Sequence, residues 1–561
     1  GNWTPSGVPT SSDDLVINSA GVNTATIGSA GALAKTLTIG STAGTNGALV
    51  IDGAGTLGVS SNYLVVGDYG TGTLTISGGG KLTSAGGVVA NNPSSSGTMT
   101  ITGAGSQWTN SFLSISADTG AVGRVKVEAG GKLQSSGNVM IGESSVNADG
   151  QLTVTGSGSD FTMTSAGIAQ FRVGAVGKGD FQLLDNATAS TKYTYLGGSV
   201  GSLGTATVSG GASWTTGSFT VGPQGHGDLT VSSGGKVITT GSGATARIGN
   251  GKVTVTGAGS QWTIDGNNYL PLLIGSTSQT AELKILNGSA VAIDANATNF
   301  LSADLRLANG ANEKASITID GAGSSFTTPY RVYMGNGTNS TVDTTVSGGG
   351  KLNTGYTSIA SASDATTATA DTVTVTGSGS VWAISNTLGS GPSDLQGLTI
   401  GGAGKGVLTI ADGGVVRVNG GTGGVGIGGL AGSSGTLSIG AAAGSAAVAP
   451  GTLEASTAIF VSSAAAPQAV NFNHTSSNYI FAPKLDGNGP GAVNVIAGTT
   501  IFTADNTYTP LTTIYAGATL QLGNGGTTGG ITGNVANNGT LIIDRSNDFG
   551  LGYAGVISGT G

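Results

Sequence analysis

The segment Ile101-Thr-Gly-Ala-Gly-Ser-Gln-Trp108 decides the fold, because the chain repeats it. It returns as Val255-Thr-Gly-Ala-Gly-Ser-Gln-Trp262 and as Val375-Thr-Gly-Ser-Gly-Ser-Val-Trp382. A second segment, Ile76-Ser-Gly-Gly-Gly-Lys-Leu82, also recurs and alternates with the first at intervals of 24 to 27 residues. A period in this range is typical of a solenoid, in which each unit buries its apolar face against its neighbours.

The repeated unit has the pattern of β-strands. In Thr73-Leu-Thr-Ile-Ser77 the apolar residues Leu74 and Ile76 alternate with hydroxyl residues, which is the signal of a strand buried on one side. Glycine clusters follow such segments and permit corners with positive φ. One rung is expected to contain three short strands, at residues 64–67, 73–77 and 81–83.

The sequence therefore predicts an all-β protein that folds as a parallel β-helix with almost no α-helix. Parallel connections within one sheet are right-handed in about 98% of cases, so right-handed winding is expected. We predict about 22 rungs of about 25 residues, stacked at ~4.8 Å as a rod.

The composition excludes several classes of protein. The 561 residues include 105 glycines without a Gly-X-Y period, so collagen is excluded. Only 9% of the residues are charged and the net charge is −8, with no basic stripe, so nucleic acid and an anionic membrane surface are unlikely partners. Without cysteine there is no disulfide, zinc–thiolate site or cysteine nucleophile. No apolar run reaches 18 residues, and we expect no cofactor or metal ion.

The character of the repeat changes towards the C-terminus. The double-segment rung dominates residues 1–455, and an alanine-rich stretch includes Ala441-Ala-Ala-Gly-Ser-Ala-Ala-Val-Ala-Pro450. Residues 456–561 still alternate like strands, so we expect a continuing β-helix with another type of rung. The chain begins without a signal peptide and stops at Gly561 inside a repeat, so further protein is expected beyond it.

Residues 506–561 resemble the passenger-associated transport repeat of bacterial autotransporters. The resemblance rests on Asn506-Thr-Tyr-Thr, on Thr512-Thr-Ile-Tyr-Ala-Gly-Ala-Thr-Leu-Gln-Leu522 and on Tyr553-Ala-Gly-Val-Ile-Ser-Gly559, whereas Pro510-Leu511 departs from the family pattern. It implies a right-handed β-helical passenger that is exported through the outer membrane and acts in adhesion, self-association or biofilm formation. A protease subgroup of that family carries a Gly-Asp-Ser-Gly motif, which this chain lacks.

Two histidines were weighed as catalytic residues. Gly225-His-Gly-Asp228 is similar to a segment of β-helical pectin hydrolases, in which paired carboxylates act as acid and base. However, His226 occupies the position of Thr71 in another copy of the repeat, so we interpret it as a turn residue. His474 has no partner near it in the sequence and is expected at the surface. No catalytic residue is assigned.

Four tryptophans hold equivalent positions in the repeat and were considered as a sugar-stacking surface. Phenylalanine replaces tryptophan in two other copies, which favours packing under a corner of the coil. The tryptophans are Trp108, Trp214, Trp262 and Trp382, and the replacements are Phe161 and Phe326.

Pairs of outward threonines precede the same glycine corner and form the candidate binding face. Stacking should align them as a flat, uncharged ladder in alternate rungs, with hydroxyls that donate and accept hydrogen bonds. Threonine is also simply a favourable exposed strand residue. The candidates are Thr100, Thr102, Thr153, Thr155, Thr205, Thr207, Thr254, Thr256, Thr374 and Thr376.

The sequence is best explained by a non-catalytic adhesin on the bacterial surface. Its expected partners are copies of itself on neighbouring cells, or host and matrix molecules that include glycans. The alternatives are a β-helical polysaccharide hydrolase or lyase, and a passive stalk that presents another region.

Overall fold

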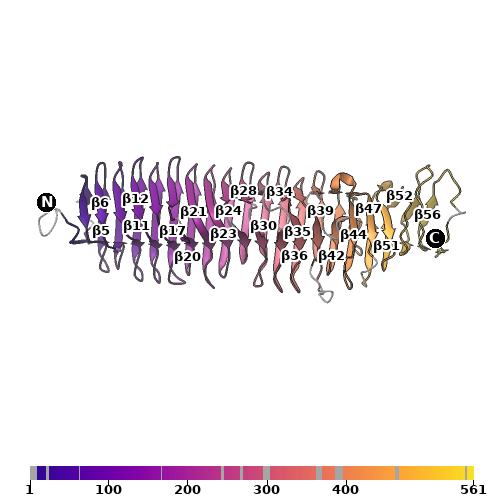
Figure 1. Cartoon of the computed structure of the whole chain (residues 1–561), viewed down its shortest axis with the longest axis horizontal. Helices are drawn as coiled ribbons and strands as arrows, with labels where there is room; N and C mark the ends of the chain where they lie inside the picture. Colours follow the sequence, from indigo (N-terminus) through magenta and orange to yellow (C-terminus); the bar gives the residue numbers. More distant parts are fainter. Residues whose placement is uncertain are drawn as a thin grey trace. The chain divides into compact units, whose positions relative to one another are not determined.

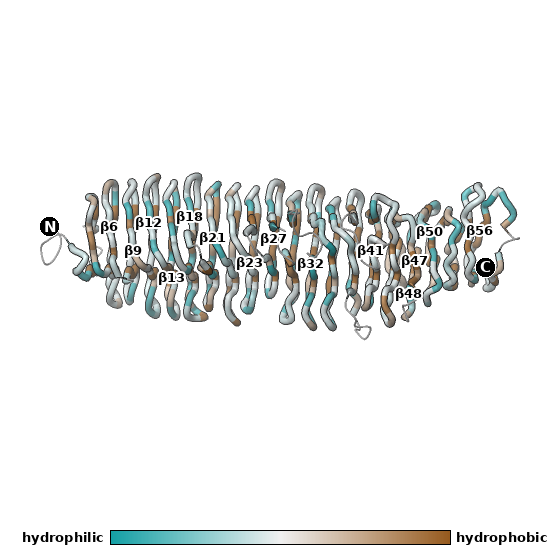
Figure 2. Tube along the Cα trace, viewed as in Figure 1, coloured by the Kyte–Doolittle hydropathy of each residue, from teal (hydrophilic) through white to brown (hydrophobic). Residues whose placement is uncertain are grey.

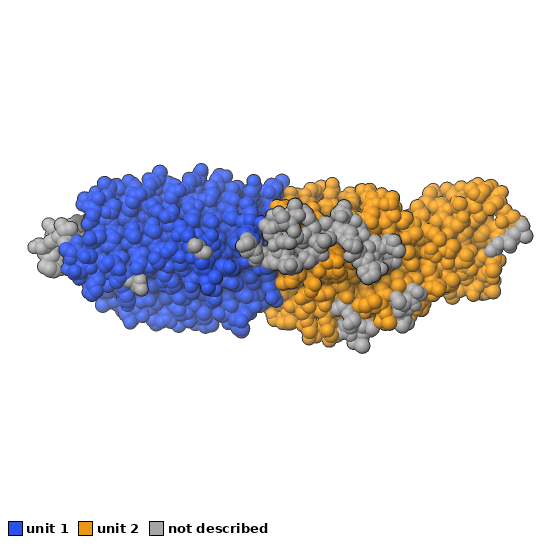
Figure 3. Space-filling model, viewed as in Figure 1, with its two compact units in different colours: residues 1–265 blue, residues 266–561 orange. Residues whose placement is uncertain are grey.

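The computed structural model describes residues 9–19, 24–61, 63–165, 167–241, 245–265, 270–294, 304–361, 369–385, 396–461, 466–549 and 553–561. The chain divides into two compact units, residues 1–265 (unit 1) and 266–561 (unit 2), which Figure 3 colours separately. Each unit is a parallel β-helix, which confirms the predicted fold class. Within each unit, strands of successive rungs lie side by side (Figure 1). The only helical element among the described residues is the 3-10 turn η1 (Asn419–Gly421). In the described part, no helix has the length and apolar character needed to span a bilayer.

A complete rung of unit 1 contains three strands, as predicted, and equivalent strands stack as three parallel ladders. Ladder 1 comprises β2 (Ala25–Ile27), β5 (Asn46–Ile51), β8 (Thr71–Ile76), β11 (Ser96–Thr102), β14 (Val122–Glu128), β17 (Asp149–Thr155), β20 (Lys178–Leu184), β22 (Leu203–Val208), β24 (His226–Ser232) and β27 (Gly251–Thr256). Ladder 2 comprises β3 (Ala32–Ala34), β6 (Thr56–Val59), β9 (Lys81–Ser84), β12 (Gln107–Asn110), β15 (Lys132–Ser135), β18 (Asp160–Met163), β25 (Lys236–Thr239) and β28 (Gln261–Asp265). Ladder 3 comprises β1 (Asp14–Ile17), β4 (Thr36–Ile39), β7 (Leu64–Val66), β10 (Gly87–Val89), β13 (Leu113–Ile115), β16 (Val139–Ile141), β19 (Gln170–Val173) and β26 (Ala246–Ile248). The long strands β21 (Thr188–Leu196) and β23 (Ser213–Val221) run through ladders 2 and 3.

Unit 2 contains the same three ladders in its first part. Ladder 1 comprises β30 (Ala281–Leu286), β33 (Lys314–Asp320), β36 (Thr341–Ser347), β39 (Asp371–Thr376), β42 (Lys405–Ala411), β45 (Ser434–Gly440), β48 (Gln468–Asn473), β51 (Gly491–Ala497), β53 (Leu511–Ile514), β55 (Val535–Asn537) and β57 (Ile557–Ser558). Ladder 2 comprises β31 (Ala290–Asp294), β34 (Ser325–Thr327), β37 (Lys351–Thr354), β40 (Val381–Ile384), β43 (Val415–Val418) and β46 (Thr452–Glu454). Ladder 3 comprises β29 (Leu272–Ile274), β32 (Asp304–Leu307), β35 (Arg331–Met334), β38 (Thr357–Ile359), β41 (Gln396–Ile400), β44 (Gly424–Ile427), β47 (Thr457–Phe460) and β50 (Lys484–Gly487). A separate four-stranded sheet contains β49 (Tyr479–Phe481), β52 (Thr499–Phe502), β54 (Thr519–Leu522) and β56 (Thr540–Ile543).

Two details of the predicted rungs are corrected. The chain forms about 19 turns instead of about 22, because many connections in unit 2 are longer than the 25-residue average. For example, Asp371 pairs with Gly406, 35 residues further on. From β51 onward each rung has two described strands instead of three. The predicted boundary between residues 455 and 456 stays a prediction, as does the right-handed winding.

The interior of each unit is filled by the alternating apolar residues of the strands. In β8 the side chains of Leu74 and Ile76 are fully buried, whereas Thr73 and Thr75 point outward. The same alternation appears along the tube in Figure 2. Each buried Leu or Ile side chain contributes about 1.5–3 kcal/mol. Stacking these positions in register therefore joins successive rungs into a continuous core.

A column of glycines shapes one corner of every full rung of unit 1. The second position of the ladder 1 strands is glycine in β8 and β11, where Gly72 pairs with Gly97. A Cβ at Gly72 would lie 2.2 Å from the backbone nitrogen of Gly67, so no larger residue fits without moving the main chain. The column consists of Gly47, Gly72, Gly97, Gly123, Gly150, Gly179, Gly204, Gly227 and Gly251.

Candidate functional site

The outward side chains of ladder 1, here named the ladder 1 face, include all ten threonines predicted from the sequence. Each of these threonines is partly exposed and alternates with a buried apolar neighbour. In unit 1 they lie on β11, β17, β22 and β27, and in unit 2 on β39. The structure thus brings the predicted residues onto one type of surface in each unit. Their role in binding stays a prediction.

The predicted register of the threonines needs correction at one pair. Thr205 lies opposite Asp180 and Asp228, whereas Thr207 lies opposite Gln182 and Thr230. Thr100, by contrast, lies opposite Lys126, the residue that also pairs with Thr153. The Thr205–Thr207 pair is therefore shifted by two residues along the strand relative to the others.

Unit 2 contains a longer threonine ladder than the sequence indicated. Thr318 pairs with Thr345, Thr345 with Thr374, and Thr374 with Thr409, so four consecutive rungs carry threonine at one position. Single threonines therefore occupy consecutive rungs here, whereas the spacing of the Thr-x-Thr pairs stays a prediction. Sequence reasoning missed Thr318, Thr345 and Thr409 because it searched for Thr-x-Thr pairs, and the residue two positions later is Asp320, Ser347 or Ala411.

The column continues from threonine into serine and asparagine, although Ser438 and Asn471 are buried and do not belong to the exposed face. Thr409 pairs with Ser438, Ser438 with Asn471, and Asn471 with Asn494. The Asn494 amide donates to the Asn471 side-chain oxygen at 2.9 Å, and the Asn471 amide donates to the Ser438 hydroxyl at 3.5 Å. Rungs of unit 2 are thus linked by hydrogen bonds between uncharged side chains.

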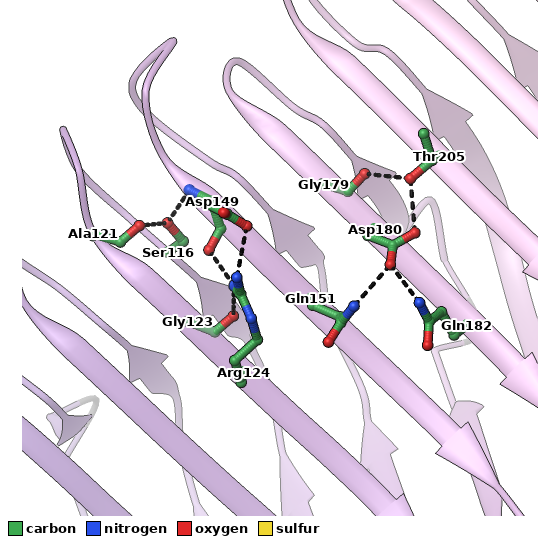
Figure 4. Close-up of polar contacts among 10 residues, drawn as sticks. All are labelled: Ser116, Ala121, Gly123, Arg124, Asp149, Gln151, Gly179, Asp180, Gln182 and Thr205. Atoms are coloured by element: carbon green, nitrogen blue, oxygen red, sulfur yellow. Dashed lines mark hydrogen bonds and ion pairs between the residues drawn. The ribbon is translucent and has the colours of Figure 1, made fainter.

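In unit 1 carboxylates interrupt the ladder and bind its polar side chains. Asp180 accepts hydrogen bonds from the amides of Gln151 and Gln182, both at 2.8 Å, and from the hydroxyl of Thr205 at 2.7 Å (Figure 4). Each of these bonds to a charged acceptor contributes about 1.5–3 kcal/mol. Asp180 therefore joins β17, β20 and β22 across the outer face.

An arginine on the same face is fully engaged with the neighbouring rung. The Arg124 guanidinium lies 3.0 Å from Asp149 Oδ1 and donates to the Asp149 carbonyl at 2.7 Å (Figure 4). Lys126 Nζ lies 2.6 Å from Glu128, two residues further along the same strand. These two ion pairs neutralise Arg124 and Lys126 within the face, and they contribute little to stability because they are exposed.

Some of the ten predicted threonines donate their hydroxyl hydrogen bonds to carboxylates of the same molecule. Thr155 donates to Asp185 at 2.9 Å and Thr376 donates to Asp412 at 3.1 Å. Five of the ten make no side-chain hydrogen bond to another described residue, so their hydroxyls can bind another molecule. They are Thr100, Thr102, Thr207, Thr254 and Thr374.

The histidine weighed as a catalytic residue lies on the ladder 1 face. His226 is the first residue of β24, as Thr71 is the first residue of β8, so it begins a strand instead of lying in a turn. Its Nε2 lies 3.3 Å from Asp228 Oδ1. Across the ladder, Asp228 has Thr205 and Lys252 as neighbours, not a second carboxylate. The register therefore does not place beside Asp228 the second carboxylate that acid and base catalysis requires.

The prediction that His474 lies at the surface is wrong. The residue is fully buried, its Nε2 lies 3.0 Å from the Thr500 hydroxyl, and its ring centroid lies 5.0 Å from that of Tyr479. Burial lowers the pKa of His474 to about 4. The imidazole is therefore a neutral part of the unit 2 core.

The four tryptophans are packing residues, as favoured from the sequence. All are fully buried, so none can stack on a sugar. Each indole N–H donates to a hydroxyl of the preceding rung, at 3.0 or 3.1 Å. These bonds join Trp108 to Ser84, Trp214 to Thr191, Trp262 to Thr239 and Trp382 to Thr354. No group of three potential metal ligands occurs among the described residues.

Comparison with known proteins finds one local sequence match. No family model matches the chain. Fifty residues, 9% of the chain, are 62% identical to a segment of the adhesin BmaC autotransporter of Brucella suis biovar 1 (strain 1330), and the chain spans 1% of the length of that protein. A solved structure of a hyper-glycosylated TibA fragment aligns with 90% of this chain and 97% of its own, at 15% identity and a TM-score of 0.16.

The local match, on a chain that folds as a parallel β-helix, supports an autotransporter passenger. Such a passenger is exported through the outer membrane and exposed at the cell surface.

Proposed function

We propose that this chain is an adhesin-type passenger without catalytic activity, whose ladder 1 face contacts copies on neighbouring cells. Such contacts produce cell aggregation and biofilm formation, and the same face can hold a cell to a host or inert surface. The name of the Brucella relative is consistent with adhesion. The alternatives remain a polysaccharide hydrolase or lyase and a passive stalk.

The observation that carries the proposal is the uncharged ladder of unit 2. Thr318, Thr345, Thr374 and Thr409 lie in register on consecutive rungs, about 4.8 Å apart. A second copy that aligns with this ladder repeats the same contact at every rung. Hydrogen bonds of about 0.5–1.5 kcal/mol each then add up through multivalency.

Charge distribution favours contact between identical copies. Like charges that face each other would oppose association, whereas the column of Thr318, Thr345, Thr374 and Thr409 carries none, although the exposed Asp343 lies two residues before Thr345. In unit 1, Arg124 and Lys126 are already paired with Asp149 and Glu128. Few charges are therefore left for a salt-bridge zipper, and hydroxyl contacts are the better candidates for the adhesive force.

The test displays the passenger on non-aggregating cells and measures their settling. Thr345→Lys with Thr374→Lys should abolish aggregation, because lysines on two copies repel each other. The fourfold replacement of Thr100, Thr102, Thr254 and Thr256 by lysine tests the residues predicted from the sequence.

The matched control is the double change Thr83→Lys and Thr263→Lys on the outward side of ladder 2. It adds the same charge to another face and should leave aggregation intact. If both ladder 1 variants aggregate like the parent while folding normally, the ladder 1 face is only a solvated surface.

A further inference from the structure

The arginines are concentrated on a face that differs from the threonine ladder. Outward side chains of ladder 3, here named the ladder 3 face, include four of the seven arginines in the chain, although the net charge is −8. Two lie in unit 1 and two in unit 2. These arginines are Arg172, Arg247, Arg306 and Arg331.

In unit 1, Arg172 is paired with an aromatic ring of the next rung. Arg172 on β19 lies in register with Tyr195 on β21, and its guanidinium carbon is 5.7 Å from the centre of that ring. Its Nε donates to the side-chain oxygen of Gln170 at 2.7 Å. The terminal Nη groups donate to no described residue. The guanidinium is thus held in a fixed orientation with free donors.

The surroundings of Arg172 extend this surface over adjacent rungs. Tyr193 lies in register with Gln170 and is 38% exposed, so a flat ring is available to a ligand. Tyr195 pairs with Thr220, and Thr220 pairs with the exposed Arg247. From β19 to β26, no described outward residue of ladder 3 is acidic.

Unit 2 repeats the arrangement with different supporting residues. Arg306 on β32 lies in register with Tyr333 on β35, and the Tyr333 and Tyr356 rings are 6.4 Å apart. Asp304 holds both arginines, with Arg331 Nε at 3.0 Å and Arg306 Nη2 at 3.4 Å. One carboxylate therefore faces two guanidinium groups, which leaves a positive charge beside two aromatic rings.

We propose that the ladder 3 face binds a polysaccharide that carries carboxylates, a polyuronate. The guanidinium fork matches a carboxylate, and a tyrosine ring can pack against the apolar side of a pyranose. The rungs bring such groups to an extended chain at steps of about 4.8 Å. This proposal rests on the proposed adhesive function and adds a polyuronate as the partner of the ladder 3 face.

Charge and shape favour a polysaccharide over an anionic bilayer. The whole chain carries a charge of −8, so a broad anionic surface would repel most of it. A single acidic polymer can instead follow the ladder 3 face, where the positive groups are concentrated. Gln170 and Thr220 beside the arginine and tyrosines offer hydrogen-bonding groups for sugar hydroxyls.

The test measures binding of oligomeric polygalacturonate to the whole chain by calorimetry. Fully methyl-esterified oligomers, which lack the charge, serve as the ligand control. Arg172→Gln and Arg331→Gln should each weaken binding about tenfold, and the double variant should lose it. Tyr193→Ala should weaken binding to both charged and esterified oligomers. Arg417→Gln, the same change on ladder 2, should have no effect.

The outcomes separate this proposal from the aggregation proposal. Arg172→Gln with Arg331→Gln should lose polygalacturonate binding and keep cell aggregation, whereas Thr345→Lys with Thr374→Lys should do the reverse. The polyuronate proposal is overturned if the parent does not bind polygalacturonate, if it binds esterified oligomers equally, or if the arginine variants bind normally. Arginine-dependent binding to phosphatidylserine vesicles in place of the oligomers would assign the face to membranes instead.

Discussion

The two units form the same type of rung but differ in the residues at the corner before ladder 1. In unit 1 a glycine stands near the start of the ladder 1 strand in nine successive rungs, and the backbone of the preceding corner lies against it, as Gly67 lies against Gly72. In unit 2 the equivalent residues include Ala281, Ala315, Val342 and Asp371 before glycine returns at Gly406. The spacing of these equivalent residues varies, from 27 residues between Ala315 and Val342 to 35 between Asp371 and Gly406. The corner of unit 1 thus requires glycine, whereas the corner of unit 2 accepts larger residues, including the buried Asp371.

The largest expected effect breaks the core that both units share. Leu74→Asp, or Ile101→Asp, places a carboxylate at a fully buried position and should destabilise unit 1 by about 5 kcal/mol or more. Limited proteolysis would reveal new cleavage in the affected rungs. Thr75→Asp, one residue away on the outer surface, is the control and should leave the digestion pattern unchanged. Equal resistance of Leu74→Asp and the parent would refute the strand register.

The second prediction tests the corner itself. Gly72→Ala puts a Cβ 2.2 Å from the Gly67 nitrogen and should cost about 3 kcal/mol or more, because only main-chain movement can make room. In unit 2 the reverse change, Ala315→Gly, should cost about 1 kcal/mol or less, through backbone entropy. Chemical denaturation measures both. If the two variants lost similar free energies of unfolding, the proposed difference between the two corners would be refuted.

A third prediction concerns the carboxylate that occupies this position in unit 2. Asp371 is buried, and its Oδ1 accepts a hydrogen bond from the Val342 N–H at 2.6 Å. Burial raises the pKa of Asp371 from 3.8 to about 7, although this hydrogen bond lowers it. The unfolded carboxyl releases its proton first, so unit 2 should lose stability as the pH rises from 3.8 to about 7.

Asp371→Asn should remove that part of the pH dependence and stabilise unit 2 at pH 8 by on the order of 3 kcal/mol. Thermal unfolding of parent and variant between pH 4 and pH 8 measures the difference. Asp343→Asn in the neighbouring rung is the control, because Asp343 is exposed and accepts a hydrogen bond from Thr372 at 2.7 Å. A parent and an Asp371→Asn variant with parallel pH profiles would show that Asp371 is ionised in the folded unit.

The smallest effect is expected at His226 in unit 1. His226→Ala removes a partly exposed side chain next to Asp228, so stability should change by about 0.5 kcal/mol or less. Aggregation should also stay at the parental level. Cleavage of polygalacturonate that disappears in this variant would instead support the hydrolase alternative.

Because the repeats are regular, the sequence predicts the strands, their inward residues and the equivalent positions of successive rungs. Leu74 and Ile76 were placed inward from alternation alone, and the equivalence of His226 with Thr71 follows from the alignment of the copies. Features without a second copy were harder to predict. His474 was assigned to the surface because nothing in its local sequence shows that the aromatic residue Tyr479 packs against it.

Cross-rung register was the part of the candidate site that sequence could not determine. Thr345 and Thr374 are 29 residues apart, and only the length of the connection between them places them side by side. Asp371 was missed for a related reason. It falls at a glycine position of the repeat, but this is visible only when β39 and β42 are aligned in register.

The tryptophan stack makes the two units optically distinguishable. Three buried indoles, Trp108, Trp214 and Trp262, belong to unit 1 and one, Trp382, belongs to unit 2. Because Phe161 occupies the same column, phenylalanine should fill the positions of Trp108, Trp214 and Trp262, and with Trp3 also replaced Trp382 is the one indole left. Its emission would shift to longer wavelength when unit 2 opens to water. In that variant, selective excitation of Trp382 follows the unfolding of unit 2 without an indole signal from unit 1.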